Sequence, residues 1–293
     1  MGFSIQDLVI VHWLKGNNFL NAGDAVLELG SQQLNNDLIE NPSSLDDLAK
    51  LFGVTPFSEA FGWKIKAQKH LESGMQELPK DAPLAQKLYE HLGLKYACVD
   101  IDDNPYSIKM DLNYDSVPAA HRGKYALVTN LGTTEHAANQ LNAFKMIHDF
   151  TGPDGFMVHS LPFQGFETHG LVNYTMKFFW LLIRSNMYQV IDADISAWKR
   201  TSMPVDIVNF TNRNSRIFRN KDHVKEMELQ DTGITIVLQK RHDMDFIPPL
   251  DVSPGTRTKD LNLKKRYPTV LDRDSWDIRV LRGKNFIKKL FCI

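Results

Sequence analysis

Short apolar runs alternate with amphipathic stretches along most of the chain. Four of these runs cover residues 24–30, 95–102, 124–130 and 156–162, and each ends at a glycine, an acid, an amide or a proline. Continuous apolar runs of this length are typical of strands that are buried on both faces of a parallel sheet. Because helical patterns separate the runs, the sequence predicts an α/β fold with helices on both faces of the sheet.

Amphipathic segments predict the helices. Residues 4–14 form a first helix, and residues 43–94 form a helical insertion whose pieces each close on a glycine. A helix covering residues 174–185 is the last one predicted. Between the helical insertion and this last helix, another helix starts near Thr133, and "TGPDG" at 151–155 ends it. Four apolar residues are expected on one face of that helix: Ala137, Leu141, Phe144 and Ile147.

The later part of the chain predicts further strands and an extension. Residues 187–195 and 233–241 are strand candidates, and the polar stretch 198–228 between them reads as an excursion from the sheet. We therefore expect one domain over residues 1–245, with insertions at about 43–94 and 198–228, and a basic C-terminal extension over 246–293. This extension either packs on the domain or on another subunit, or binds an anionic partner.

Composition excludes several classes of protein. The chain has 293 residues, 43% of them hydrophobic, and its net charge of −1 does not favour nucleic acid as the main partner. Its two cysteines, Cys98 and Cys292, cannot form a disulfide framework or a CxxC zinc site. The N-terminus does not read as a secretory signal, and the apolar stretch at 178–183 is far too short to span a bilayer. We expect a cytoplasmic protein, and leave open whether it forms homo-oligomers.

Candidate ligand-binding residues follow the strands, because open parallel sheets bind ligands outside the carboxyl ends of their strands. The first strand ends with Glu28 and Gly30, the second with Asp100, and the next short run with Asp111. Carboxylates in these positions can accept hydrogen bonds from ribose hydroxyls, so together they favour a nucleoside-containing ligand. Each residue taken alone also fits a structural turn or a loop cap.

Four histidines lie between Asn130 and Tyr174. His136, beside Glu135 in the first turn of the predicted helix, could converge with His159 and His169. Three convergent histidines suit either a metal site or a general base with helpers. Since no H-x-x-x-H or H-x-H spacing is present, we expect proton transfer or substrate orientation and no metal. His148 lies on the apolar face of the helix and reads as a core histidine.

Several segments resemble class I S-adenosylmethionine-dependent methyltransferases, in particular a bacterial subgroup associated with glycan and secondary-metabolite pathways. They are "VLELG", "YACVDID", "MDLN", "ALVTNLGTTEHAANQLNAF", "IHDFTGPDGFMVHSLPFQG" and "HGLVNYTMKFFWLL". The resemblance covers roughly residues 25–241, and residues 130–174 are its most specific part. It implies a Rossmann-like sheet of seven strands, mostly parallel, whose last strand is antiparallel.

The resemblance also implies a set of cofactor contacts for S-adenosylmethionine. Glu28, Gly30 and Ser31 would line the methionine end, while Asp100 would hold the ribose and Ile101 flank the adenine. The remaining implied contacts are Asp111 and Leu112 at the adenine, and Asn130 and Leu131 behind the methyl sulfonium. The chain departs from the family pattern at Gln32, where a second glycine is usual, and in the long connection between its first two strands.

The expected function is methyl transfer to a small-molecule or glycan acceptor, by O- or N-methylation. His136 or His159 would act as the base, and His169 and Gln164 would shape the acceptor pocket. A non-catalytic binding or scaffold protein with the same fold is the alternative that Gln32 and the basic C-terminal tail support. A nicotinamide-dependent oxidoreductase would also use Asp100, but it requires a fuller glycine motif.

Overall fold

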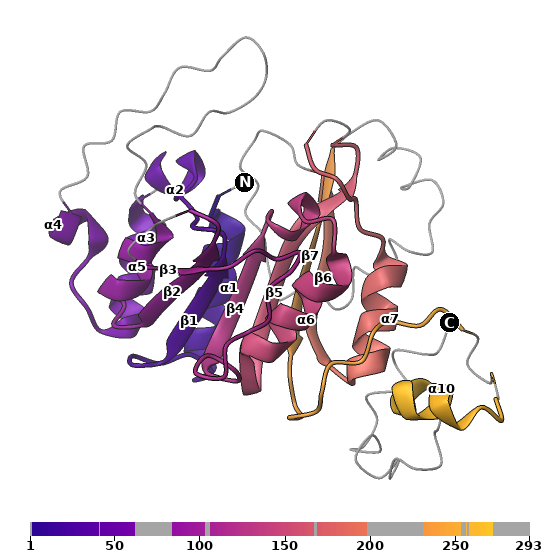
Figure 1. Cartoon of the computed structure of the whole chain (residues 1–293). Coiled ribbons are helices and arrows are strands. Elements are labelled where there is room, and N and C mark those ends of the chain that lie inside the picture. Colours follow the sequence, from indigo (N-terminus) through magenta and orange to yellow (C-terminus); the bar gives the residue numbers. More distant parts are fainter. Residues whose placement is uncertain are drawn as a thin grey trace.

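The computed structural model describes residues 2–40, 42–61, 84–102, 106–166, 169–197, 231–252, 256 and 258–271. Their main feature is one seven-stranded sheet in the order β3-β2-β1-β4-β5-β7-β6, with helices packed around it (Figure 1). The strands are β1 (Ala25–Leu29), β2 (Lys95–Asp100), β3 (Ser107–Lys109), β4 (Tyr125–Leu131), β5 (Thr151–Gln164), β6 (Gln189–Ala197) and β7 (Thr232–Gln239).

Strand directions confirm the predicted sheet. β1 pairs in parallel with β2 and β4, β2 with β3, and β4 with β5. The last strand, β7, is antiparallel to both of its neighbours, β5 and β6. The result is a mostly parallel, Rossmann-like sheet with its final strand antiparallel, as the resemblance to methyltransferases implied.

Helices cover both faces of the sheet, as predicted. On one face α1 (Ile5–Gly16), α3 (Pro42–Phe52) and α5 (Ala85–His91) pack their buried leucines against Val26 and Leu127. On the other face α6 (Gln140–Phe150) and α7 (Met176–Asn186) cover Leu27 and Val128. Neighbouring strand residues therefore point to opposite faces, as the two-residue period of a strand requires.

Local side-chain bonds set where helices begin. The backbone N–H of Ser4 donates to Asp7 Oδ2 at 2.8 Å, which satisfies an N–H that the first turn of α1 leaves unpaired. Thr175 Oγ1 accepts from the backbone N–H of Phe178 at 3.2 Å at the start of α7. Short helices α2 (Asn36–Glu40) and α4 (Phe57–Phe61) complete the described part of the first crossover.

The helix predicted from Thr133 starts later than expected. A 3-10 turn, η1 (Thr134–His136), comes first, and α6 starts only at Gln140. Leu141, expected on the apolar face, has 52% of its surface exposed. The predicted end of the helix at "TGPDG" is confirmed, since α6 ends at Phe150, but these five residues already belong to β5, which starts at Thr151 and not near Phe156.

Close backbone packing explains why glycines stand in this strand. A Cβ on Gly155 would lie 2.9 Å from the carbonyl oxygen of Tyr125, and one on Gly152 would lie 3.0 Å from that of Gly123. The pairing of β4 with β5 is irregular between Tyr125 and Leu127. Glycine is thus needed for the approach of the two backbones rather than for a turn.

Part of the predicted extension packs on α7. Arg184 Nη2 donates to the carbonyl oxygen of Leu250 at 2.5 Å, and Thr269 Oγ1 in α11 (Pro268–Leu271) donates to that of Ser185 at 2.6 Å. The short helix α10 (Leu261–Arg266) precedes α11 (Figure 1).

Several segments with sequence predictions lie outside the described residues: 62–83 of the helical insertion, 198–230 with the polar insertion, and 272–293 of the extension. Among the helices that are described, none combines the length and the apolar character that crossing a membrane requires.

Candidate functional site

The order of the strands reverses between β1 and β4. From β1 the sheet continues through β2 to β3 in one direction, and the chain then returns to place β4 and β5 on the other side. Loops that leave two such strands in opposite directions open a crevice at their carboxyl ends, which is where open α/β sheets bind ligands. Here the two strand ends are tied together, because Thr133 Oγ1 donates to the carbonyl oxygen of Leu29 at 2.6 Å.

The turn after β1 is built on Gly30, whose positive φ of 72° favours glycine. Protein atoms fill the space beside its Cα. A Cβ on this residue would lie 3.0 Å from Thr133 Oγ1 and 3.4 Å from Gln32 Nε2. The Gln32 side chain folds back over the turn, with its Nε2 3.4 Å from the carbonyl oxygen of Leu29. The Gln32 side chain therefore fills space that a glycine at position 32 would leave open.

Glu28 lies beneath this turn and is fully buried. Its Oε2 accepts hydrogen bonds from the Tyr96 hydroxyl at 2.8 Å and from the backbone N–H of Gln32 at 3.3 Å. Burial raises the pKa of Glu28 to about 8. Three buried oxygens at the turn have no hydrogen-bond partner among the described residues: Glu28 Oε1, Ser31 Oγ and Gln32 Oε1.

Asp100 and Asp111 lie at the next two strand ends. Asp100 Oδ2 accepts from the backbone N–H of Ser31 at 3.2 Å, which joins the end of β2 to the Gly30 turn. The carbonyl oxygen of Asp100 accepts from the backbone N–H of Met110, directly before Asp111, at 3.0 Å. Asp100 and Asp111 thus come at neighbouring strand ends, whereas the Glu28 side chain lies beneath the Gly30 turn.

Two predicted adenine contacts follow these carboxylates. Ile101 has 67% of its surface exposed, which is unusual for an apolar side chain beside a strand end. Leu112 is half-buried against the core, and its carbonyl oxygen accepts from Asn142 Nδ2 at 2.9 Å. The loop after β3 is therefore fastened to α6, and Ile101 is open to solvent at the edge of the sheet.

The side chains of His159 and Asn130, two predicted site residues, face the interior. Asn130 is fully buried, and its Nδ2 donates to Thr134 Oγ1 at 2.9 Å and to His159 Nδ1 at 3.3 Å. His159 is 1% exposed between the rings of Phe144 and Phe179. Burial lowers the pKa of His159 to about 3, so the ring is neutral at physiological pH.

This burial argues against His159 as the base. Strand parity explains it, since His159 shares the face of β5 that α6 and α7 cover, together with Met157 and Leu161. Leu131 is also buried, with 2% of its surface exposed.

His148 is a core histidine as predicted, with its two ring nitrogens 2.6 Å from the Tyr188 hydroxyl and 2.7 Å from the carbonyl oxygen of Met244.

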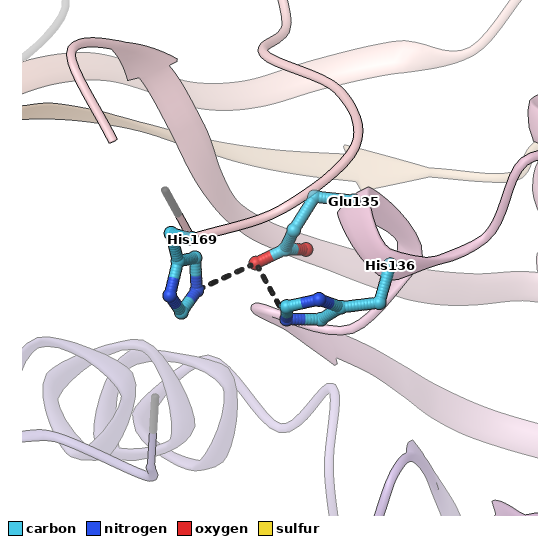
Figure 2. A group of neighbouring side chains, drawn as sticks. All are labelled: Glu135, His136 and His169. Carbon is cyan, nitrogen blue, oxygen red and sulfur yellow. Dashed lines mark ion pairs between the residues drawn. The ribbon is translucent and has the colours of Figure 1, made fainter. Parts of the chain in front are cut away.

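The other two predicted histidines do converge, and they meet on a carboxylate. His136 Nε2 lies 4.0 Å and His169 Nε2 lies 3.5 Å from Glu135 Oε1, and the two rings are 5.0 Å apart (Figure 2). Glu135 has no exposed side-chain surface, whereas His136 is 49% and His169 34% exposed. We call these three residues the Glu135 cluster.

The carboxylate of this cluster has no hydrogen-bond partner on either oxygen among the described residues. Burial raises the pKa of Glu135 to about 7, and burial lowers the pKa of both histidines. Sequence reasoning placed Glu135 near the crevice but did not identify it as the residue that the histidines share. The sequence signal that could have identified Glu135 is its position next to His136, in a turn that follows a strand.

A hydrogen-bond network holds the turn that carries Glu135 and His136. Thr134 Oγ1 accepts a hydrogen bond from Asn130 Nδ2 and lies 2.8 Å from the Tyr174 hydroxyl oxygen. That hydroxyl also donates to Gln140 Oε1 at 2.5 Å, and Gln140 Nε2 donates to the carbonyl oxygen of Thr134 at 2.6 Å. The Asn130 side chain therefore positions η1.

Gly170 lets the loop that carries His169 approach Glu135. A Cβ on Gly170 would lie 2.8 Å from Glu135 Cγ, which is closer than real Cβ contacts allow. The backbone N–H of Leu171 donates to the carbonyl oxygen of Glu135 at 2.8 Å and fixes the loop against the turn. Any side chain at position 170 would force the cluster apart.

Comparison with other proteins adds little beyond the architecture. No protein-family model matches the chain, and a search of curated proteins finds no match. Among solved structures, a SAM-dependent methyltransferase from Archaeoglobus fulgidus matches with a TM-score of 0.38 and 10% identity, over 79% of this chain and 93% of that one. The 1,6-didemethyltoxoflavin-N1-methyltransferase of Burkholderia thailandensis, with bound S-adenosylhomocysteine, has a TM-score of 0.39 and 11% identity, over 80% and 76%.

A third similar structure is the [4+2]-cyclase SpnF, with a TM-score of 0.36 and 9% identity, over 80% of each chain. Likenesses at these low scores and identities carry no argument about activity.

Proposed function

We propose that the protein is an S-adenosylmethionine-dependent methyltransferase that acts on a small-molecule or glycan acceptor by O- or N-methylation. The observation that carries the proposal is the position of Asp100, hydrogen-bonded to the Gly30 turn at the point where the strand order reverses. Carboxylates at neighbouring carboxyl ends of parallel strands are placed to accept from ribose hydroxyls.

The residues at the Gly30 turn fit an adenosyl ligand that carries an amine. Glu28 Oε1 and Ser31 Oγ are buried oxygens with no partner among the described residues, and an ammonium group supplies the donors that they lack. In this proposal Ser31 and Glu28 hold the methionine end, Asp100 the ribose, and Ile101 with Asp111 and Leu112 the adenine. The bound cofactor supplies an electrophilic methyl group.

Gln32 must move before the ligand can reach the turn. Its Nε2 makes only long contacts, 3.4 Å to Leu29, 3.5 Å to Gly30 and 3.4 Å to Thr133. Hydrogen bonds of this length are weak, so displacement of the amide costs little. Gln32 Oε1 has no partner among the described residues, so displacement of the amide breaks no hydrogen bond to this oxygen.

The acceptor side of the site is the Glu135 cluster. His136 and His169 are partly exposed on the loops that follow β4 and β5, and these loops leave from the same edge of the sheet as the Gly30 turn. Orientation of the acceptor and assistance with the loss of its proton are what a methyl transfer to oxygen or nitrogen requires of the protein. Gln164 is the last residue of β5, directly before the loop that leads to His169.

Isothermal titration calorimetry of the full chain with S-adenosylmethionine, S-adenosylhomocysteine and NAD tests this function. We expect both adenosyl compounds to bind with one site per chain and NAD not to bind. The absence of heat with either adenosyl compound would contradict the proposal.

A second candidate is a non-catalytic binding protein with the same fold. Thr133 and Gln32 favour it, because they fill the space beside Gly30. In that case neither adenosyl compound binds to the wild-type chain or to a variant with alanine in place of Gln32.

A further inference from the structure

The Glu135 cluster brings together three metal-ligating groups, two from η1 and one from the loop after β5. One ligand atom from each of Glu135, His136 and His169 lies within 4.8 Å of those of the other two. We infer that these three side chains form a binding site for a divalent transition-metal ion such as Zn²⁺, contrary to the expectation from sequence that no metal is bound.

The distances fit one shared ion. Bonds of 2.0–2.1 Å in a tetrahedral site place two ligand atoms ~3.3 Å apart. Glu135 Oε1 lies 3.5 Å from His169 Nε2 and 4.0 Å from His136 Nε2. Small rotations of the two partly exposed imidazoles are sufficient to close the difference, because the carboxylate between them already points at both rings (Figure 2).

The unpartnered carboxylate is the observation that points to a ligand. Buried carboxylates are paired or hydrogen-bonded in nearly all proteins, since burial without a partner is costly. Glu135 has no exposed side-chain surface, and neither of its oxygens has a hydrogen-bond partner in the described part of the chain. Both nearby nitrogens belong to imidazoles, which bind metal when neutral. A shared cation would satisfy all three groups.

The ligand set indicates which ion binds. Imidazole suits zinc, iron and other first-row transition metals, while magnesium and calcium prefer oxygen ligands. Two histidines and one carboxylate leave at least one coordination position open, as in catalytic rather than structural zinc sites. His136 and His169 are 49% and 34% exposed, so the open position is accessible from solvent.

The surrounding structure holds the ligands in place. The hydrogen bonds among Asn130, Thr134 and Gln140 fix the turn that carries Glu135 and His136. The bond from the Leu171 N–H to the carbonyl oxygen of Glu135 and the absence of a side chain at Gly170 fix the third ligand. Outer contacts of this kind orient ligands and preserve affinity.

Metal binding does not depend on the proposed methyl transfer, because its test needs no cofactor. If the protein both binds the metal ion and transfers a methyl group, His136 and His169 act as metal ligands. The charge of the ion, rather than a histidine, then lowers the pKa of the acceptor group.

A Zn²⁺ titration of the chelator-treated full chain against a chromophoric chelator tests the site, without any adenosyl compound. We expect one ion per chain in the wild type, and a loss of affinity of at least tenfold in Glu135→Gln, in His136→Ala and in His169→Ala. His12→Ala is the matched control, since His12 is exposed on α1 outside the cluster, and it should bind as the wild type does.

Circular dichroism identifies any variant that fails to fold. His136→Ala and His169→Ala change partly exposed side chains, so they keep the test decisive if Glu135→Gln does not fold. Substitution with Co²⁺ should give the visible absorption of a tetrahedral or five-coordinate site in the wild type only. No binding by the wild type, or equal binding by folded cluster variants, would overturn the inference. Calorimetry with S-adenosylhomocysteine on the same samples separates this result from the proposed cofactor site.

Discussion

The side-chain amide nitrogen of Gln32 lies 3.4 Å from the hydroxyl oxygen of Thr133, and the two groups together fill the space beside Gly30. One of them comes from the loop after β1 and the other from the loop after β4, where the strand order reverses. The contact therefore closes the position at which a parallel α/β sheet ordinarily receives its ligand.

Removal of the Gln32 side chain should strengthen cofactor binding. In Gln32→Ala the ligand no longer has to displace the amide, whose weak hydrogen bonds contribute about 1 kcal/mol, so the affinity for S-adenosylhomocysteine should rise roughly fivefold. Gln33→Ala is the matched control, because Gln33 contacts Phe3 through its backbone carbonyl oxygen. Calorimetry measures both. Weaker binding in Gln32→Ala would show that Gln32 serves the ligand and does not compete with it.

Asp100 should carry a large share of the binding to the ribose. Asp100→Asn keeps the size of the side chain but removes the charge, and hydrogen bonds to charged groups contribute about 1.5–3 kcal/mol. The dissociation constant for S-adenosylhomocysteine should therefore rise about 10- to 100-fold. Asp102→Asn, two residues along on the exposed turn, is the control and should bind as the wild type does. Equal constants for the two variants would remove Asp100 from the site.

Glu28 should make stability fall as the pH rises. Its pKa is raised from 4.5 to about 8 in the folded protein, mainly by burial. Between these values the folded state binds a proton that the unfolded state has lost, so the free energy of unfolding decreases with pH. The loss approaches about 4 kcal/mol between pH 5 and pH 8.

Glu28→Gln removes this titration, so the difference in stability between variant and wild type should shift in favour of the variant from pH 5 to pH 8. Urea unfolding at several pH values measures the difference. Glu59→Gln, at an exposed site on α4, is the control. A constant difference between Glu28→Gln and wild type across this range would contradict the assignment.

Gly170→Ala should disturb the Glu135 cluster. The added methyl group would lie 2.8 Å from Glu135 Cγ and 3.2 Å from the carbonyl oxygen of Glu135, so the loop or the carboxylate must move. Overpacking of this kind costs about 1–3 kcal/mol of stability, and Zn²⁺ affinity should fall with it. Gly16→Ala is the control, since a Cβ there meets nothing within 4 Å. Unchanged stability and unchanged Zn²⁺ binding in Gly170→Ala would show that the loop lies elsewhere in solution.

The sheet was predictable because its central strands are continuous apolar runs. Val26 and Leu27 are adjacent, point to opposite faces of the sheet and are both fully buried. In a strand with one face in solvent, apolar and polar residues would alternate. The start of α6 was not predictable in the same way. Its helical pattern extends back to Ala137, but the side chains of Asn130 and Gln140 hold residues 134–136 in a 3-10 turn, and these contacts exist only after folding.

The sequence was sufficient to predict site residues that follow the end of a strand. It was not sufficient to predict toward which face of the sheet a side chain points. Asp100 and Asp111 follow their strands, so they reach the edge of the sheet. His159 also lies near the end of a strand, but it faces α6 and α7 and is buried. Glu135 was difficult to identify because one of its two histidine partners, His169, comes from a loop whose approach depends on Gly170.

A crystal of the full chain soaked with S-adenosylhomocysteine tests the central claim most directly. The account predicts one ligand across the carboxyl ends of β1, β2 and β3, with its ribose hydroxyls on Asp100 and the Gln32 amide turned away from Thr133. A ligand bound elsewhere, or an unchanged Gln32 with no ligand at saturating concentration, would contradict it.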